Sequence, residues 1–107
     1  MEVLERETLN AKLEEETAFL LFVQSSFCGT CQAAAKVLQG IEVYYQMTID
    51  TVDINYVSDL IQVQSVPALL VINEGEVLHT RYRMSPVNDV INWVWNTYIS
   101  LENSDFG

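Results

Sequence analysis

The stretch Phe19-Leu20-Leu21-Phe22-Val23 leads through a short polar segment into Cys28-Gly29-Thr30-Cys31, and this passage is the most informative part of the sequence. The run from Ala18 to Gln24 is nearly continuous in apolar residues, as expected for a strand buried on both faces. The apolar positions after the cysteines follow helical spacing: Ala34, Val37, Leu38 and Ile41. A strand that ends in C-x-x-C and enters a helix places both sulfurs at the helix N-terminus, where free N–H groups and the dipole favour a thiolate. The passage therefore predicts a redox site.

Helix and strand patterns alternate on both sides of this passage. We expect the helix after the cysteines to end near Gly40, because glycine is common at helix ends. The other elements expected in the first part of the chain are a short edge strand from Val3-Leu4, a helix capped by Thr8 that carries Leu9 and Leu13, a strand over 47–54 and a short helix over 56–63. This order predicts a parallel β-α-β unit followed by a further helix.

The second half changes character. Two strands, 68–72 and 77–82, are joined by the Gly-containing turn Asn73-Glu74-Gly75-Glu76, which indicates an antiparallel hairpin. The last helix is expected to begin with Ser85 as N-cap and Pro86 in the first turn. Its apolar face is predicted to hold Val87, Val90, Ile91, Val94, Trp95 and Tyr98, to about Leu101, with Trp93 off that face. The whole pattern predicts an α/β domain with a mixed sheet covered on both faces.

Length and charge limit what the chain can do. At 107 residues, half of them hydrophobic, residues 1–107 are expected to form a single domain with a real core. The formal net charge of −10 argues against nucleic acid and membrane partners, because both reward clustered Lys and Arg. The same charge leads us to expect neutral or basic proteins as partners. The acidic N-terminus lacks the pattern of a secretory signal, so we expect a cytoplasmic protein. In that reducing compartment a close cysteine pair is more often catalytic or metal-binding than structural.

Four features together resemble the thioredoxin family over nearly the whole chain. They are C-G-T-C after a buried strand, Ser65-Val66-Pro67-Ala68, the N-E-G-E hairpin and an amphipathic C-terminal helix. The resemblance implies a thioredoxin fold, in which β-α-β and β-β-α units form a central mixed sheet flanked by helices. It also implies that Cys28 is the exposed nucleophile and Cys31 the buried resolving thiol, in a redox-active disulfide that needs no other cofactor and no metal.

The resemblance further assigns an active-site loop of Phe27, Gly29 and Thr30, and a substrate-binding position at Val66-Pro67. By resemblance the Val66–Pro67 bond is cis, faces the cysteines and binds the partner through the Val66 backbone. In this family a Trp usually precedes the first cysteine and a Pro lies between the pair, whereas this chain has Phe27 and Thr30. Because Thr30 replaces a rigid residue at the start of the helix, the sequence leaves the reduction potential open.

Two further departures concern the core. The family buries an Asp six residues before the first cysteine, where this chain has Phe22, and it pairs that Asp with a Lys that has no counterpart in residues 49–52. The absence of both residues is consistent, because an Asp or a Lys alone would be a buried charge without a partner. We expect resolution by Cys31 to be slower or differently tuned.

The function implied by the resemblance is thiol-disulfide exchange. The leading hypothesis is a monomeric reductase of disulfide-containing proteins that is itself recharged by another reductase. An isomerase-like or oxidising enzyme is a neighbouring alternative, and a thioredoxin-like adaptor whose cysteines act only as a redox switch belongs to a different class. A glutaredoxin-like iron–sulfur protein is disfavoured, because no Gly-Gly-x-Asp element follows Ala68, and a zinc site is disfavoured, because only His79 could add to the two thiols.

Overall fold

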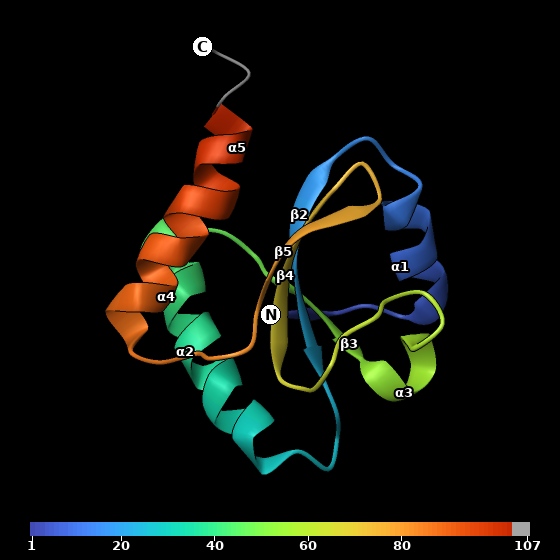
Figure 1. The fold of residues 1–107 in the computed structure, drawn as a ribbon, viewed down its shortest axis with the longest axis horizontal. Coiled ribbons are helices and arrows are strands. Elements are labelled where there is room, and N and C mark those ends of the chain that lie inside the picture. Colours follow the sequence, from blue (N-terminus) through green and yellow to red (C-terminus); the bar gives the residue numbers. More distant parts are fainter. Residues whose placement is uncertain (104–107) are drawn as a thin grey trace.

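A five-stranded sheet forms the centre of the protein, with the strand order β1-β3-β2-β4-β5. The computed structural model describes residues 1–103 (Figure 1). The strands are β1 (Glu2–Val3), β2 (Ala18–Gln24), β3 (Asp50–Asp53), β4 (Ala68–Asn73) and β5 (Glu76–Arg81). β1, β3 and β2 run parallel, whereas β4 is antiparallel to both β2 and β5. The predicted mixed α/β sheet, built from a β-α-β unit and a β-hairpin, is confirmed.

Helices cover both faces of this sheet. On one face lie α1 (Arg6–Leu13) and α3 (Ile54–Val57), and on the other lie α2 (Gly29–Tyr45), α4 (Val87–Val94), the π-helical segment η1 (Trp95–Ile99) and α5 (Ser100–Asn103), as Figure 1 shows. Each face therefore has its own apolar core. None of the helices in residues 1–103 combines the length and the apolar character needed to span a membrane.

The central strand β2 connects the two cores. Its middle five residues are all buried, and alternation sends Leu20 and Phe22 toward α2 and Leu21 and Val23 toward α1. Each fully buried side chain of this size contributes about 1.5–3 kcal/mol. This double burial explains why the strand has a continuous apolar run in place of an alternating one, and the predicted bounds of β2 are correct.

Helix α2 is longer than predicted. It passes through Gly40 and ends at Tyr45, with Gln46 as a left-handed C-cap at φ 54°. Leu38 and Ile41 on either side of Gly40 are buried in the core. Their burial exceeds the penalty of roughly 1 kcal/mol for a glycine inside a helix, so the helix continues.

Two predicted helix caps are wrong. α1 begins at Arg6 with Glu5 as its N-cap, so Thr8 lies inside the helix. α4 begins at Val87 with Pro86 as its N-cap, so Ser85 lies before the cap. In both helices the N-cap side chain makes no capping hydrogen bond, which removes the chemical signal on which the predictions relied.

The prediction for the two tryptophans, with Trp95 on the apolar face of the last helix and Trp93 off it, is wrong. Trp93 is partly buried against the core, whereas Trp95 is 50% exposed. The buried face is centred on Val90 and Val94, and helical spacing places Trp93 on its flank and Trp95 beyond it.

The turn between β4 and β5 touches the end of the first helix. Glu74 and Gly75 both have positive φ, 53° and 77°, as in the tightest hairpin turns. The Glu74 N–H donates to the Thr17 carbonyl at 3.4 Å, and a Cβ on Gly75 would collide with the Leu13 carbonyl oxygen. Glycine is therefore required here both by conformation and by space.

Candidate functional site

The two cysteines lie at the start of α2 and form a disulfide. Cys28 is the N-cap of the helix, and its Cα is 5.2 Å from that of Cys31. Cys28 is partly exposed, whereas Cys31 is completely buried in the core beneath the helix. An attacking partner can therefore reach the first sulfur and not the second, which is the division of exposure that thiol-disulfide exchange requires.

Two donors point at the Cys28 sulfur. The Cys31 N–H donates to Sγ at 3.1 Å, and the Thr30 hydroxyl, 3.3 Å away, donates to the same atom because a disulfide sulfur carries no proton. After reduction the same two donors would stabilise a negative charge on Cys28, in addition to the helix N-terminus. Thr30, found where the family usually has proline, thus supplies a hydrogen bond that proline lacks.

The loop that carries Cys28 is tied to the end of β3. The Cys28 N–H donates to the Ser25 carbonyl at 3.2 Å, and the Ser26 hydroxyl donates to Asp53 Oδ2 at 2.8 Å. Partial burial acts to raise the pKa of Asp53, but hydrogen bonds from Asn55 and Ser26 outweigh it and hold that pKa below its usual value. Asp53 is therefore ionised at neutral pH and anchors the active-site loop.

The other loop residues differ in exposure. Phe27 is 95% exposed, so it offers an apolar ring to solvent directly before Cys28. A Cβ on Gly29 would meet no other atom within 4 Å, so the segment between the cysteines is open. This part of the surface is free to contact a partner.

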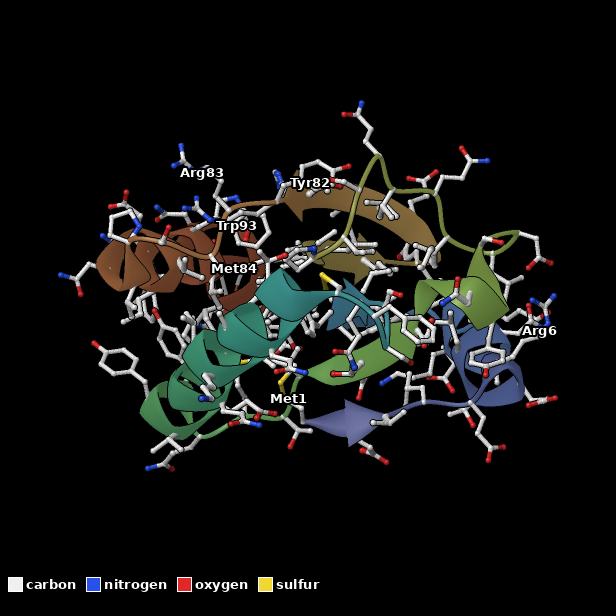
Figure 2. The ribbon with its side chains drawn as sticks, turned by 90° about the horizontal axis from the view of Figure 1, so that it is seen from below. Met1, Arg6, Tyr82, Arg83, Met84 and Trp93 are labelled. Atoms are coloured by element: carbon white, nitrogen blue, oxygen red, sulfur yellow. A yellow bond between two sulfur atoms is a disulfide. The ribbon has the colours of Figure 1, made fainter. Side chains whose placement is uncertain are left out.

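The Val66–Pro67 bond is cis, as the resemblance implied, and the Val66 carbonyl oxygen lies 3.9 Å from Cys28 Sγ. Beside it is a hollow of about 440 Å³ between the start of α2 and the segments before β4 and after β5. We call it the uncharged groove, because none of its lining residues is charged: Thr30, Ala33, Ala34, Val37, Ser65, Val66, Pro67, Tyr82, Met84 and Ser85. Met84 and Tyr82 are labelled in Figure 2. The groove can accept an apolar side chain next to the disulfide.

The core beneath the disulfide carries no charge at Phe22, where the family has an Asp, or at the register partner of Phe22. Phe22 is completely buried, and its register partner on β3 is Thr51, which faces the same side of the sheet. The Thr51 hydroxyl is buried and has no hydrogen-bond partner within residues 1–103. Phe22 and Thr51 therefore offer no carboxylate or ammonium to exchange a proton with Cys31.

A charged pair that the sequence pattern did not predict lies on the other face of the sheet, toward α1. Asp50 on β3 is buried and accepts a hydrogen bond from the Lys12 ammonium group of α1. The same ammonium lies 4.6 Å above the ring of Phe19. The only sequence signal for this pair was an acidic residue between the apolar residues of a predicted strand.

The zinc alternative would need His79 near the cysteines. His79 lies on the edge strand β5, where it is exposed and its ring packs edge-to-face on Trp93 at 6.5 Å. In the part of the chain that the structure describes, no group of three His, Cys, Asp or Glu side chains could hold a metal ion.

A disulfide at the start of the helix after the central strand, opposite a cis X–Pro bond, defines a thioredoxin-like redox domain. The sequence model of TraF, the F plasmid transfer operon protein, matches residues 1–81. The thioredoxin-like protein YusE of Bacillus subtilis (strain 168) is 30% identical over 78 residues, which cover 69% of this chain and 74% of that relative. The chain belongs to the thioredoxin-like family, and the predicted fold class is confirmed.

Proposed function

We propose that the protein is a thiol-disulfide oxidoreductase that reduces disulfides in other proteins, with Cys28 as nucleophile and Cys31 as resolving thiol. The observation that carries the proposal is the unequal exposure of the two sulfurs, together with two donors aimed at the accessible one. A cytoplasmic location would keep the pair reduced between turnovers.

The reaction begins from the reduced pair. The Cys28 thiolate attacks one sulfur of the substrate disulfide, the substrate S–S bond breaks, and its other sulfur leaves as a thiolate that takes up a proton from water. Cys31 then attacks Cys28 Sγ, which forms the protein disulfide and releases the second substrate sulfur. That sulfur takes up the proton that Cys31 loses. Two electrons pass to the substrate, and a dithiol reductase returns two electrons to the pair.

The surroundings suit these steps. The Val66 backbone next to Cys28 is available to pair with an extended substrate segment, and the uncharged groove accepts an apolar neighbour of the substrate cysteine. Because Phe22 and Thr51 supply no carboxylate or amine, the proton of Cys31 passes to the departing thiolate directly or through water.

The test is a redox titration in dithiothreitol buffers, read as the alkylated fraction of Cys28 and Cys31. We expect a reversible disulfide with a potential near −270 mV, about the value of thioredoxin, and reduction of a disulfide-linked peptide by the wild type only. The Cys31→Ser variant should accumulate a mixed disulfide and the Cys28→Ser variant should not. A potential of about −180 mV or higher would replace the reductase by an isomerase or oxidant.

A second candidate is an adaptor whose cysteines act only as a redox switch. It is favoured by one observation, the 95% exposed ring of Phe27 on the surface that a partner would meet. An adaptor would keep its partner after Cys28→Ser and Cys31→Ser together, whereas a reductase would lose turnover in that variant.

A further inference from the structure

A second hollow, of about 610 Å³, lies on the other side of the active-site loop. We call it the acidic hollow. Its lining residues are Val3, Leu4, Glu5, Arg6, Glu7, Gln24, Ser26, Asp53, Tyr56 and Val57. The last residues of the three parallel strands, Val3, Asp53 and Gln24, are all among them. In open α/β sheets, ligands bind outside the carboxyl ends of the strands, so this is a favoured place for a binding site.

The hollow is joined directly to the active-site loop. Ser26, two residues before Cys28, lines it and donates to Asp53, which lines it as well. Figure 2 shows Arg6 at one end of the molecule, well separated from Met84, which lines the uncharged groove. A protein held at Cys28 thus has the uncharged groove on one side and the acidic hollow on the other.

The charges of the hollow favour a cation. Its lining contains three carboxylates, on Glu5, Glu7 and Asp53, and one guanidinium, on Arg6. That guanidinium is already occupied, since its two terminal nitrogens lie 2.5 and 2.6 Å from the Asp59 carboxylate oxygens and one of them donates to the Tyr56 carbonyl at 3.1 Å. The bond to Asp59 raises the pKa of Arg6. Arg6 is therefore not free to hold an anion.

The three carboxylates that line the hollow have no cationic partner within residues 1–103. Neither Glu5 nor Glu7 forms a salt bridge within residues 1–103, and Glu7 acts on Arg6 only through longer-range attraction. Asp53 accepts hydrogen bonds from neutral donors only, so its charge is not cancelled. An incoming cation would meet uncompensated negative charge.

The remaining walls are apolar and aromatic. Val3 is 73% exposed and Tyr56 is 71% exposed, while Val57 is buried in the core behind them. Lysine and arginine suit such a site, because their long apolar stems cover apolar surface while their charged ends reach carboxylates. The exposed Tyr56 ring adds a face on which a cation is attracted.

We propose that the acidic hollow binds a lysine or arginine side chain of the protein whose disulfide is exchanged at Cys28. This inference rests on the proposed function and names its substrate class: proteins that carry a basic residue near the reactive cysteine. The uncharged groove takes the apolar side of the same substrate segment, and the hollow takes its basic side.

The first test compares two peptides that contain the same disulfide and differ only in lysine or glutamate residues flanking it. In low salt we expect kcat/KM to favour the lysine peptide by roughly 5-fold or more, and this preference should shrink at about 200 mM salt. The variant Glu5→Gln/Glu7→Gln should bring the ratio of the two peptides close to one. The variant Glu15→Gln/Glu16→Gln removes the same charge just beyond the C-terminal end of α1 and should leave the ratio unchanged.

Equal turnover of both peptides by the wild type would overturn the inference and leave the proposed function intact. An equal loss of preference in both glutamine variants would also overturn it, because overall charge and not the hollow would then be responsible.

A binding measurement separates the inference from catalysis. The Cys28→Ser/Cys31→Ser variant is mixed with a fluorescent linear lysine peptide, and anisotropy and amide NMR shifts are recorded. We expect the shifts to centre on Tyr56 and Val57, with binding roughly 3-fold weaker after Tyr56→Leu. Binding at these residues without any turnover by the wild type would overturn the proposed function, together with the substrate class that rests on it, and would leave only a site for basic side chains. Shifts confined to other surfaces would overturn the inference about the hollow and leave the proposed function intact.

Discussion

The two sides of the sheet differ in charge along β2 and β3 and at the carboxyl ends of these strands. Toward α2, the neighbouring side chains Phe22 and Thr51 are uncharged, and so is the groove beside the disulfide. Toward α1, Asp50 is paired with Lys12, and the hollow at the strand ends carries carboxylates. Neutral donors thus contact the exposed sulfur, and among residues 1–103 the one charged pair on the α2 side, between the N-terminal amine and Glu42, lies at the second half of α2. Carboxylates gather at the strand ends, on the side that we propose recognises the substrate.

The largest expected effect comes from placing a charge on the uncharged side. Phe22→Asp loses a completely buried ring and buries a carboxylate beside Thr51, so we expect the free energy of unfolding to fall by roughly 4–5 kcal/mol. Urea unfolding measures it. The double variant Phe22→Asp/Thr51→Lys should recover about 1–3 kcal/mol, because the two positions are register partners on one face.

Phe22→Leu is the control for lost volume and should lower stability by about 1–2 kcal/mol. If Phe22→Asp were no worse than Phe22→Leu, the side toward α2 would tolerate a charge and the comparison between the two sides would not hold.

The second effect tests the charged side. The Asp50 side chain is only 9% exposed, and Lys12→Met leaves this carboxylate without its cation. We therefore expect the free energy of unfolding to fall by roughly 3 kcal/mol. Asp50→Asn leaves Lys12, which is 28% exposed and lies over Phe19, and should lower stability by only about 1–2 kcal/mol. Both values come from urea unfolding, and the reverse order would show that the carboxylate is solvated.

The third prediction tests whether the uncharged groove and the acidic hollow act separately on kcat/KM. Ala33→Leu places a larger apolar side chain in the uncharged groove from an exposed helix position, so it should lower kcat/KM by roughly 10-fold without loss of stability. Because the groove holds no charge, lysine and glutamate peptides should be affected equally. Ala33→Ser keeps the side chain small and is the matched control. A change in the ratio of the two peptides would mean that groove and hollow do not act separately.

Sequence patterns predict the bounds of an element correctly where all its residues are buried to the same degree. The bounds of β2 were correct because its residues are buried on both faces and form an uninterrupted apolar run. The end of α2 was wrong because a local glycine signal was weaker than the burial of Leu38 and Ile41 around it. Local signals fail when distant packing outweighs them.

The candidate site was predicted from resemblance more than from spacing. Nothing in the residues alone brings Val66 to 3.9 Å from the Cys28 sulfur. The Lys12–Asp50 and Ser26–Asp53 contacts join positions 38 and 27 residues apart, so they depend on strand register, which single-sequence patterns do not contain. The acidic hollow could not be predicted either, because its residues come from separate elements that only the fold brings together.

The hairpin turn at Gly75 has a consequence for protein engineering. Surface turns of small residues are the usual places for inserted tags and for new chain ends. This turn instead rests on the Leu13 carbonyl and bonds to Thr17, so it joins the second half of the chain to the first. Lengthening the turn would disturb its contacts with Leu13 and Thr17. The turn is a contact between the two halves of the chain, so a tag should be inserted at another site.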